Sequence, residues 1–152
     1  MSNNVIQHLY LTVPIPDGWE DASQVIALGP EKDGFRCNLV FSQEPTKPGE
    51  TATEFAARQL PQLRAALDGY ILVREGEARF GPNSGFLREH TFSMEKADIA
   101  QLQFYVILGG RCYTFTFTDL ERNLSSSRST GERMFSRARL TPPLAAAADN
   151  DF

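Results

Sequence analysis

The sequence has few of the residues that build chemical sites. It contains two cysteines, two histidines and one tryptophan in 152 residues. Glycine loops for nucleotides, GxSxG, HExxH and CxxC motifs are all absent from it. His8 and His90 lie far apart beside apolar residues, where a structural histidine is commoner than a catalytic one. We therefore expect a protein that is not an enzyme, with no catalytic residues, no metal site and no cofactor.

Basic residues and long apolar runs are also scarce. Fifteen Lys and Arg stand against 19 Asp and Glu, a net charge of −4 with no basic block, which argues against a nucleic-acid partner. The first residues have neither the basic lead nor the apolar run of a signal peptide, and no stretch approaches the length of a membrane span. We expect a cytoplasmic protein without a membrane anchor, in which Cys37 and Cys112 are buried free thiols.

The strongest pattern present lies between Asp98 and Thr118. Two runs with an apolar residue at every second position flank Gly109-Gly110, which predicts a β-hairpin with a two-residue turn. The opposite side of the first strand carries a mixture of apolar and amide groups in place of the charges of a solvated face: Ile99, Gln101, Gln103, Tyr105 and Ile107. We expect this second face to be covered and not fully exposed to solvent.

The rest of the chain predicts strands around two helices. Alternation indicates a strand at 9–13, a hairpin from 24–28 and 35–42 with a loop between, and strands at 70–80 and 85–94. A helix is predicted over 51–68, with Thr51 and Glu54 as a capping box and Pro61 as a kink or break. Residues 119–130 are loop-like, and a short helix follows from Ser129.

Together these elements predict an α+β fold, an antiparallel six- to seven-stranded sheet with two helices. Its size favours one domain over 1–140, with a flexible C-terminal tail at 141–152. In the first helix Gln59, Leu63 and Leu67 recur four residues apart, a wider apolar surface than a simple surface helix needs. The acidic residues of neighbouring strands, Glu75, Glu77, Glu89 and Glu95, are interpreted as solvated strand sides.

Four stretches carry a resemblance to a known family: GWEDAS at 18–23, NLVFSQE at 38–44, EFAARQLPQL at 54–63, and QLQFYVILGGRCYTFTFT followed by a helix ending in MFSRARL. Across 9–140 the chain resembles the DcrB-like family, small bacterial proteins with a PsbP-like α/β sandwich. Within it the chain is most similar to the Eag-type chaperones of type VI secretion. The resemblance implies a cytoplasmic homodimer that shields the N-terminal transmembrane helices of an effector before export.

The resemblance also implies a binding surface on the second sheet face. The matching positions are Ile26, Val40, Gln59, Leu63, Leu67, Ile99, Gln103 and Tyr105. A helix of about 20 apolar residues needs its surface covered in water, and each Å² buried contributes roughly 25 cal/mol. Glutamine amides add hydrogen bonds to polar groups on such a helix. For Leu63, Leu67 and Ile99, an ordinary core position is an equally good interpretation.

Two other classes of function fit the same sequence. A scaffold or regulatory binding protein would use the fold to bind a protein surface, through a face less apolar than the one expected here. An enzyme or small-ligand carrier would need an enclosed pocket with convergent polar groups.

Overall fold

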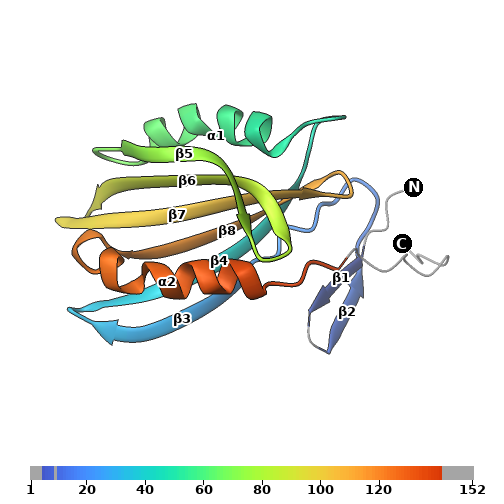
Figure 1. Ribbon diagram of the computed structural model, residues 1–152. Helices are drawn as coiled ribbons and strands as arrows, with labels where there is room; N and C mark the ends of the chain where they lie inside the picture. Colours follow the sequence, from blue (N-terminus) through green and yellow to red (C-terminus); the bar gives the residue numbers. More distant parts are fainter. Residues whose placement is uncertain (1–4, 9, 142–152) are drawn as a thin grey trace.

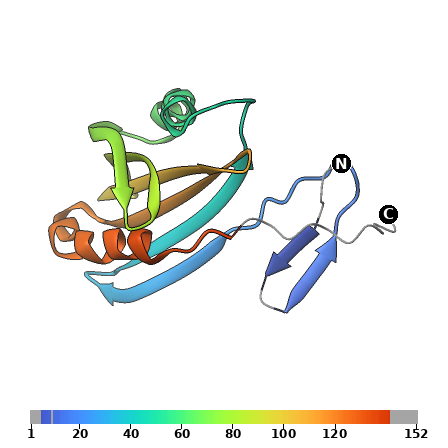
Figure 2. The ribbon, with the colours of Figure 1, turned by 45° about the vertical axis from the view of Figure 1, so that its right-hand side comes forward.

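The computed structural model describes residues 5–8 and 10–141. A six-stranded antiparallel sheet forms its centre, in the order β3-β4-β8-β7-β6-β5 (Figure 1). Its strands are β3 (Val25–Lys32), β4 (Phe35–Pro45), β5 (Ile71–Phe80), β6 (Asn83–Met94), β7 (Ala97–Leu108) and β8 (Arg111–Leu120). Helices α1 (Ala52–Ala66) and α2 (Glu121–Arg137) lie on opposite faces of it. A separate hairpin, β1 (Val5–His8) and β2 (Leu11–Pro14), extends from the sheet (Figure 2). The predicted α+β fold is confirmed.

The hairpin of β7 and β8 forms at the predicted glycine pair. Gly109 and Gly110 have φ angles of 60° and 76°, the left-handed region that a two-residue hairpin turn requires at both positions. The turn sets the register, with Leu108 opposite Arg111 and Gln103 opposite Thr116. Because side chains alternate between faces, this register decides which residues of both strands face α1 and which face α2.

The α2 face holds the main apolar core. Phe104, Phe115 and Phe135 are almost fully buried, and the Phe135 ring lies 5.5 Å from that of Phe104 and 6.0 Å from that of Phe115. Gly131 of α2 lies against the ring of Phe117, where an added Cβ would come within 2.8 Å of ring carbons. A glycine is therefore needed for α2 to pack this closely on β8.

Helix α2 begins at Glu121, so the prediction of a loop at 119–130 is wrong. Serine is a modest helix former, and the run of serines there obscures the helical period. The helix is stabilised by tertiary contacts, because Leu124 is buried in the core and Asn123 donates to Asp33. Ser127 also donates a hydrogen bond of 2.6 Å to Asp119 at the end of β8.

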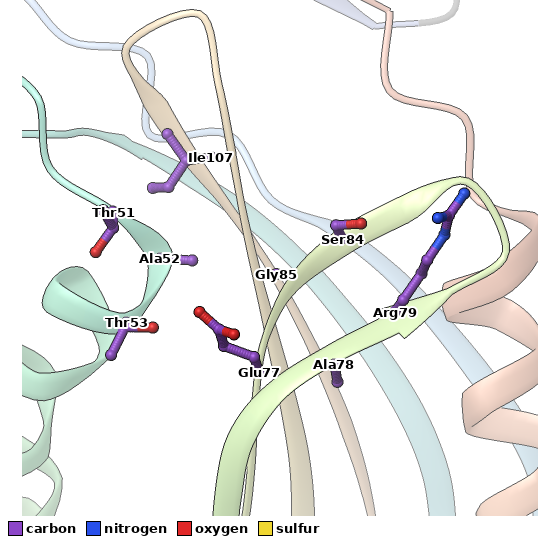
Figure 3. Close-up of a pocket in the computed structure, with 9 residues that line it drawn as sticks. All are labelled: Thr51, Ala52, Thr53, Glu77, Ala78, Arg79, Ser84, Gly85 and Ile107. Atoms are coloured by element: carbon purple, nitrogen blue, oxygen red, sulfur yellow. The ribbon is translucent and has the colours of Figure 1, made fainter.

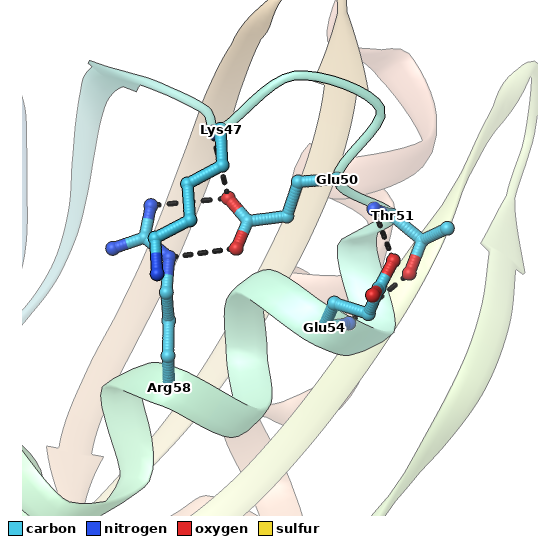
Figure 4. A network of polar contacts seen from close by, with 5 residues as sticks. All are labelled: Lys47, Glu50, Thr51, Glu54 and Arg58. Carbon is cyan, nitrogen blue, oxygen red and sulfur yellow. Dashed lines mark hydrogen bonds and ion pairs between the residues drawn. The ribbon is translucent and has the colours of Figure 1, made fainter.

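Helix α1 begins where its capping box predicts. Thr51 Oγ1 accepts a hydrogen bond from the Glu54 backbone N–H, and Glu54 accepts one from that of Thr51, both at 3.1 Å (Figure 4). Beside them Arg58 binds both carboxylate oxygens of Glu50, at 2.7 and 3.1 Å, and this hydrogen bonding is the main cause that lowers the pKa of Glu50. Pro61 does not divide the helix, which runs unbroken from 52 to 66 with the proline exposed.

Three smaller predictions have different outcomes in the structure. The loop predicted after residue 28 is mostly strand, because β3 continues past a bulge to Lys32 and turns at Asp33 and Gly34. The tail predicted to be flexible lies, from 142 onward, outside the described residues. Cys112 is buried as predicted, whereas Cys37 is only half-buried; both are free thiols.

Among residues 5–8 and 10–141, no helix has the length and apolar character needed to cross a membrane.

Glu89 is the exception to the interpretation of the acidic residues as solvated. Its side chain is 8% exposed, on the face of β6 that packs against α2. Arg128 of α2 binds its two carboxylate oxygens at 2.7 and 2.8 Å, and Arg74 of β5 donates to it at 2.8 Å. Strand alternation indicates which side of β6 carries Glu89, but it does not show that α2 covers that side. The prediction that Glu89 is solvated is therefore wrong. Glu75, Glu77 and Glu95 are exposed as expected.

We expect Glu89→Gln to lower the free energy of unfolding by about 1–3 kcal/mol near pH 7, because Arg128 loses its charged partner. The Arg128 hydrogen bonds, opposed by burial and aided by Arg74, hold the pKa of Glu89 below its usual value. This stabilisation is therefore complete above the unfolded-state pKa of about 4.3 and is lost as the pH falls through the lower folded-state pKa. Urea unfolding should show a smaller loss of stability in acid for Glu89→Gln than for the parent.

The control is Glu77→Gln, a change at an exposed carboxylate on the neighbouring strand. It should leave stability near pH 7 within about 0.5 kcal/mol of the parent. Equal acid sensitivity of the parent and Glu89→Gln would contradict the assigned role of Glu89.

Candidate functional site

The sheet face beneath α1 is only partly covered. α1 packs over β6 and β7, while β4 and β3 continue beyond it (Figure 2). On β3 the side chains of Ile26 and Leu28 are 56% and 58% exposed. We call this part of the sheet the open face. Ile26 and Leu28 are exposed on it, Asn38, Val40, Gln101, Gln103 and Thr116 are half-buried, and Thr118 is buried.

A line of hydrogen bonds crosses the sheet from under α1 to the open face. It begins at Arg88 of β6, whose side chain is 1% exposed and donates to the Ala56 carbonyl of α1 at 2.8 Å and to Glu75 at 3.0 Å. Arg88 also donates to the Tyr105 hydroxyl at 3.2 Å, and that hydroxyl donates to Gln103 Oε1 at 2.6 Å. Gln103 Nε2 lies 3.4 Å from Thr116 Oγ1.

A second line runs parallel to the first, two residues away on each of β6, β7 and β8. The Tyr70 hydroxyl lies 3.0 Å from Nδ1 of His90, a histidine with no exposed surface. His90 Nε2 lies 2.8 Å from Gln101 Oε1, and Gln101 Nε2 donates to Thr118 Oγ1 at 3.0 Å. Each line therefore joins a buried ring or cation to a glutamine and ends at a threonine of β8.

Burial shifts the proton equilibria of these groups away from their charged forms. Desolvation lowers the pKa of His90, with the Gln101 hydrogen bond acting against it, and raises the pKa of Tyr105. It also raises the pKa of the nearby Cys112 thiol to about 12. A cysteine with this pKa is protonated at neutral pH, which leaves it without the thiolate that nucleophilic chemistry needs.

The structure brings three of the eight predicted site residues, Ile26, Val40 and Gln103, together on the open face. Ile26 pairs with Val40, Val40 with Thr116, and Thr116 with Gln103, so that they form one row across four strands. From α1, Leu63 is half-buried, and it packs on none of the three buried clusters found among the described residues.

The other predicted residues lie deeper or to the side. Ile99 is completely buried and packs with Phe92 and Leu120, and the half-buried Leu67 of α1 packs on the same cluster. Tyr105 is buried and holds Gln103 in place. Gln59 is half-buried on α1. Ile99, Leu67 and Tyr105 are therefore engaged in contacts within the chain.

Sequence reasoning did not assign Gln101, Thr116 and Thr118 to the site. The available signal was the hairpin register, because counting back from Gly109-Gly110 pairs Gln101 with Thr118 and Gln103 with Thr116. The roles of Arg88 and His90 had no such signal, since each depends on β6 pairing with β7, and for Arg88 also on α1 lying above.

A hollow of about 600 Å³ lies beside the first turn of α1, lined by residues of α1, β5, β6 and β7 (Figure 3). It is open, and its two charged side chains, Glu77 and Arg79, point in different directions. It lacks the convergent polar groups of a ligand pocket. Within the described ranges, no three His, Cys, Asp or Glu side chains gather as a metal site would require.

Comparisons with known proteins agree on one fold. The DcrB family model matches residues 11–136. The crystal structure of PA94 from Pseudomonas aeruginosa, a protein of unknown function proposed as a regulator, is similar with a TM-score of 0.77 and 18% identity, over 91% of this chain and 97% of that one. No curated protein sequence matches the chain.

Two further structures are similar at lower scores. CyanoP, the PsbP of Synechocystis sp. PCC 6803, has a TM-score of 0.50 and 13% identity over 66% of this chain and 64% of its own. LpqN of Mycobacterium tuberculosis, involved in cell envelope biogenesis, has a TM-score of 0.51 and 14% identity over 86% and 90% of the two chains. The expected PsbP-like fold is confirmed.

We expect Arg88→Met to lower the free energy of unfolding by about 2–4 kcal/mol, because it leaves the Ala56 carbonyl and the Tyr105 hydroxyl without their donor. Amide hydrogen exchange in α1 should accelerate more than in α2, since Arg88 ties α1 to the sheet. The control is Arg79→Met, an exposed arginine whose Nε bonds the nearby Gly81 carbonyl. Equal protection of α1 in Arg88→Met and the parent would contradict this anchoring role.

Proposed function

The chain belongs to the DcrB family, and on that premise we propose that it is a non-enzymatic chaperone that binds and shields the N-terminal transmembrane helices of a type VI secretion effector. The observation that supports this proposal is the open face. Exposed Ile26 and Leu28 lie on its outer strand β3, and two glutamines whose amides are held in fixed positions lie on β7, with β4 and β8 between them. Such a surface suits a helix that is mostly apolar and carries a few polar groups.

The apolar part of the face supplies the affinity in this proposal. Ile26, Leu28 and Val40 form an apolar patch on β3 and β4, and the half-buried Leu63 of α1 belongs to none of the buried clusters of the described chain. Fully covering one such side chain contributes about 1.5–3 kcal/mol. A bound helix that covers several of them would be held without any charge pair, so salt should change its affinity little.

A scaffold or regulatory binding protein is the second candidate. The polar half of the open face favours it, because a face that carries glutamines, threonines and Asn38 also suits a partner with a polar surface. PA94 is proposed as a regulator and LpqN is involved in cell envelope biogenesis, and both share this fold. Fold alone does not decide between the candidates, so the partner's chemistry must be tested.

We expect Ile26→Gln and Leu63→Gln each to weaken retention of the effector's N-terminal apolar segment about tenfold, because each removes apolar area from the contact. Neither residue lies in the buried core, so the thermal midpoint should stay within a few degrees of the parent. The assay is co-expression with that segment, followed by affinity measurement at low and high salt. The matched control is Ile71→Gln, an equally exposed isoleucine on the other edge strand.

Two outcomes would count against the chaperone proposal. A large drop in the thermal midpoint of Leu63→Gln would identify Leu63 as a core residue. Co-purification of an effector from which the apolar segments were deleted would place the binding surface elsewhere, and would favour the regulatory candidate.

We also expect the protein to form a homodimer, as the chaperone resemblance implies. β3 is an edge strand of the sheet, and the backbone N–H and C=O groups along such an edge pair readily with a strand of another chain. Light scattering at micromolar concentration should give twice the chain mass of 17.0 kDa. A monomer mass at that concentration would contradict this expectation.

A further inference from the structure

The sheet opens between β6 and β7 at the end of the molecule that carries the β7–β8 turn. The ladder of these two strands ends at the pair Phe86 and Tyr105, although β6 starts three residues before this pair and β7 runs three residues past it. Beyond Gly85, β6 bends away from β7 (Figure 3). Ser84 and Ile107 then lie on either side of a space that we call the β6–β7 gap.

Contacts with the end of α2 hold the β5–β6 turn away from β7. Gly81 of this turn lies against Ser136, where an added Cβ would come within 2.5 Å of the backbone oxygen. Asn83 Nδ2 donates to the carbonyl oxygens of Phe135 and Ala138 at 2.8 and 3.0 Å. These contacts are made within the folded chain, so the gap exists without a partner to open it.

The backbone of Ile107 faces the gap. The β7–β8 turn is closed by a hydrogen bond between its first and last residues, Leu108 and Arg111, so the backbone groups of Leu108 point to β8. Successive residues of a strand direct their N–H and C=O groups to opposite sides. Those of Ile107 therefore point toward β6, on which no described residue is paired with it. Unpaired groups along a strand edge accept another extended chain.

Open space lies on both faces of the sheet beside Ile107. On the α1 face it is the hollow of about 600 Å³, in which the first turn of α1 is one wall and Glu77 belongs to another. On the α2 face a second hollow has a volume of about 400 Å³. Its apolar lining residues include Pro82, Val106, Leu108, Ala138 and Leu140. Ser84 and Ile107 line both hollows, so the gap lies between them.

We propose that the β6–β7 gap binds an extended segment of a partner protein as an added strand on β7. Side chains alternate along such a segment, and pockets for alternate side chains give this mode of binding its specificity. The residue opposite Ile107 directs its side chain into the hollow beside α1. The residues before and after it direct theirs into the apolar hollow. The segment therefore has two apolar residues with a small polar residue between them.

Arg139 adds a charge preference to the site. Among the described residues that line the 400 Å³ hollow, it is the one that carries a charge. Its side chain is exposed and makes no hydrogen bond or ion pair with the described part of the chain. A carboxylate on the apolar side of the segment would pair with this guanidinium. The gap lies away from β3 and β4, so this site does not depend on the function proposed for the open face.

The test is an NMR titration of the ¹⁵N-labelled full chain with the peptide acetyl-Val-Ser-Leu-Ser-Glu-amide. We expect a dissociation constant of about 0.1–1 mM, because a few backbone hydrogen bonds and two apolar side chains hold the peptide. The amide proton of Ile107 should move downfield as it becomes bonded, and the largest shifts should lie in residues 83–85 and 106–108. Shifts centred on β3 and β4, or no binding at about 5 mM peptide, would overturn the proposal.

The same peptide with both serine nitrogens methylated tests the backbone pairing. It keeps every side chain but loses the N–H groups that would point to β7, so it should bind at least about tenfold more weakly. Ile107→Pro removes the donor on the protein side and leaves the ladder with β8 intact, and it should have the same effect. If this variant does not fold, the methylated peptide decides alone. Equal binding of the two peptides by the parent would overturn the added strand.

Arg139→Gln tests the charge preference. It should weaken binding of the peptide about three- to fivefold and leave unchanged the affinity for the same peptide ending in glutamine. The matched control is Arg137→Gln, an exposed arginine at the end of α2 that does not line the hollow. It should bind both peptides as the parent does. An equal loss for both peptides in Arg139→Gln, or the same selective loss in Arg137→Gln, would overturn the role of Arg139.

Discussion

The buried guanidinium of Arg88 is the interaction on which the α1 side of the molecule depends. It lies inside the sheet face with 1% of its side chain exposed and has three partners, the Ala56 carbonyl, Glu75 and the Tyr105 hydroxyl. A buried cation is tolerated only when its donors are paired. Those pairs hold α1 over β6 and β7 and leave β4 and β3 uncovered, so the same contacts that satisfy the charge determine where the open face begins.

The two faces of the sheet are stabilised by different interactions. On the α2 side, stacked phenylalanines, the close packing of Gly131 on Phe117 and the paired Glu89 fill the space between helix and sheet. On the α1 side, polar side chains continue across the strands, and the described part of the chain has no buried side-chain nitrogen or oxygen without a partner. A face whose polar groups are already bonded to one another remains stable in water beside exposed apolar residues.

Sequence patterns predicted the features that depend on local periodicity. They did not predict features that depend on contacts between elements far apart in the chain. The capping box at Thr51 and the glycine turn at 109–110 are local signals, and both appear in the structure. The start of α2 was missed because its serines are weak helix formers that packing against β8 overrides. For the candidate site, alternation placed Gln103 on the second face, but the burial of Ile99 and the bonds of His90 follow from strand order and helix placement. No single-strand pattern contains that information.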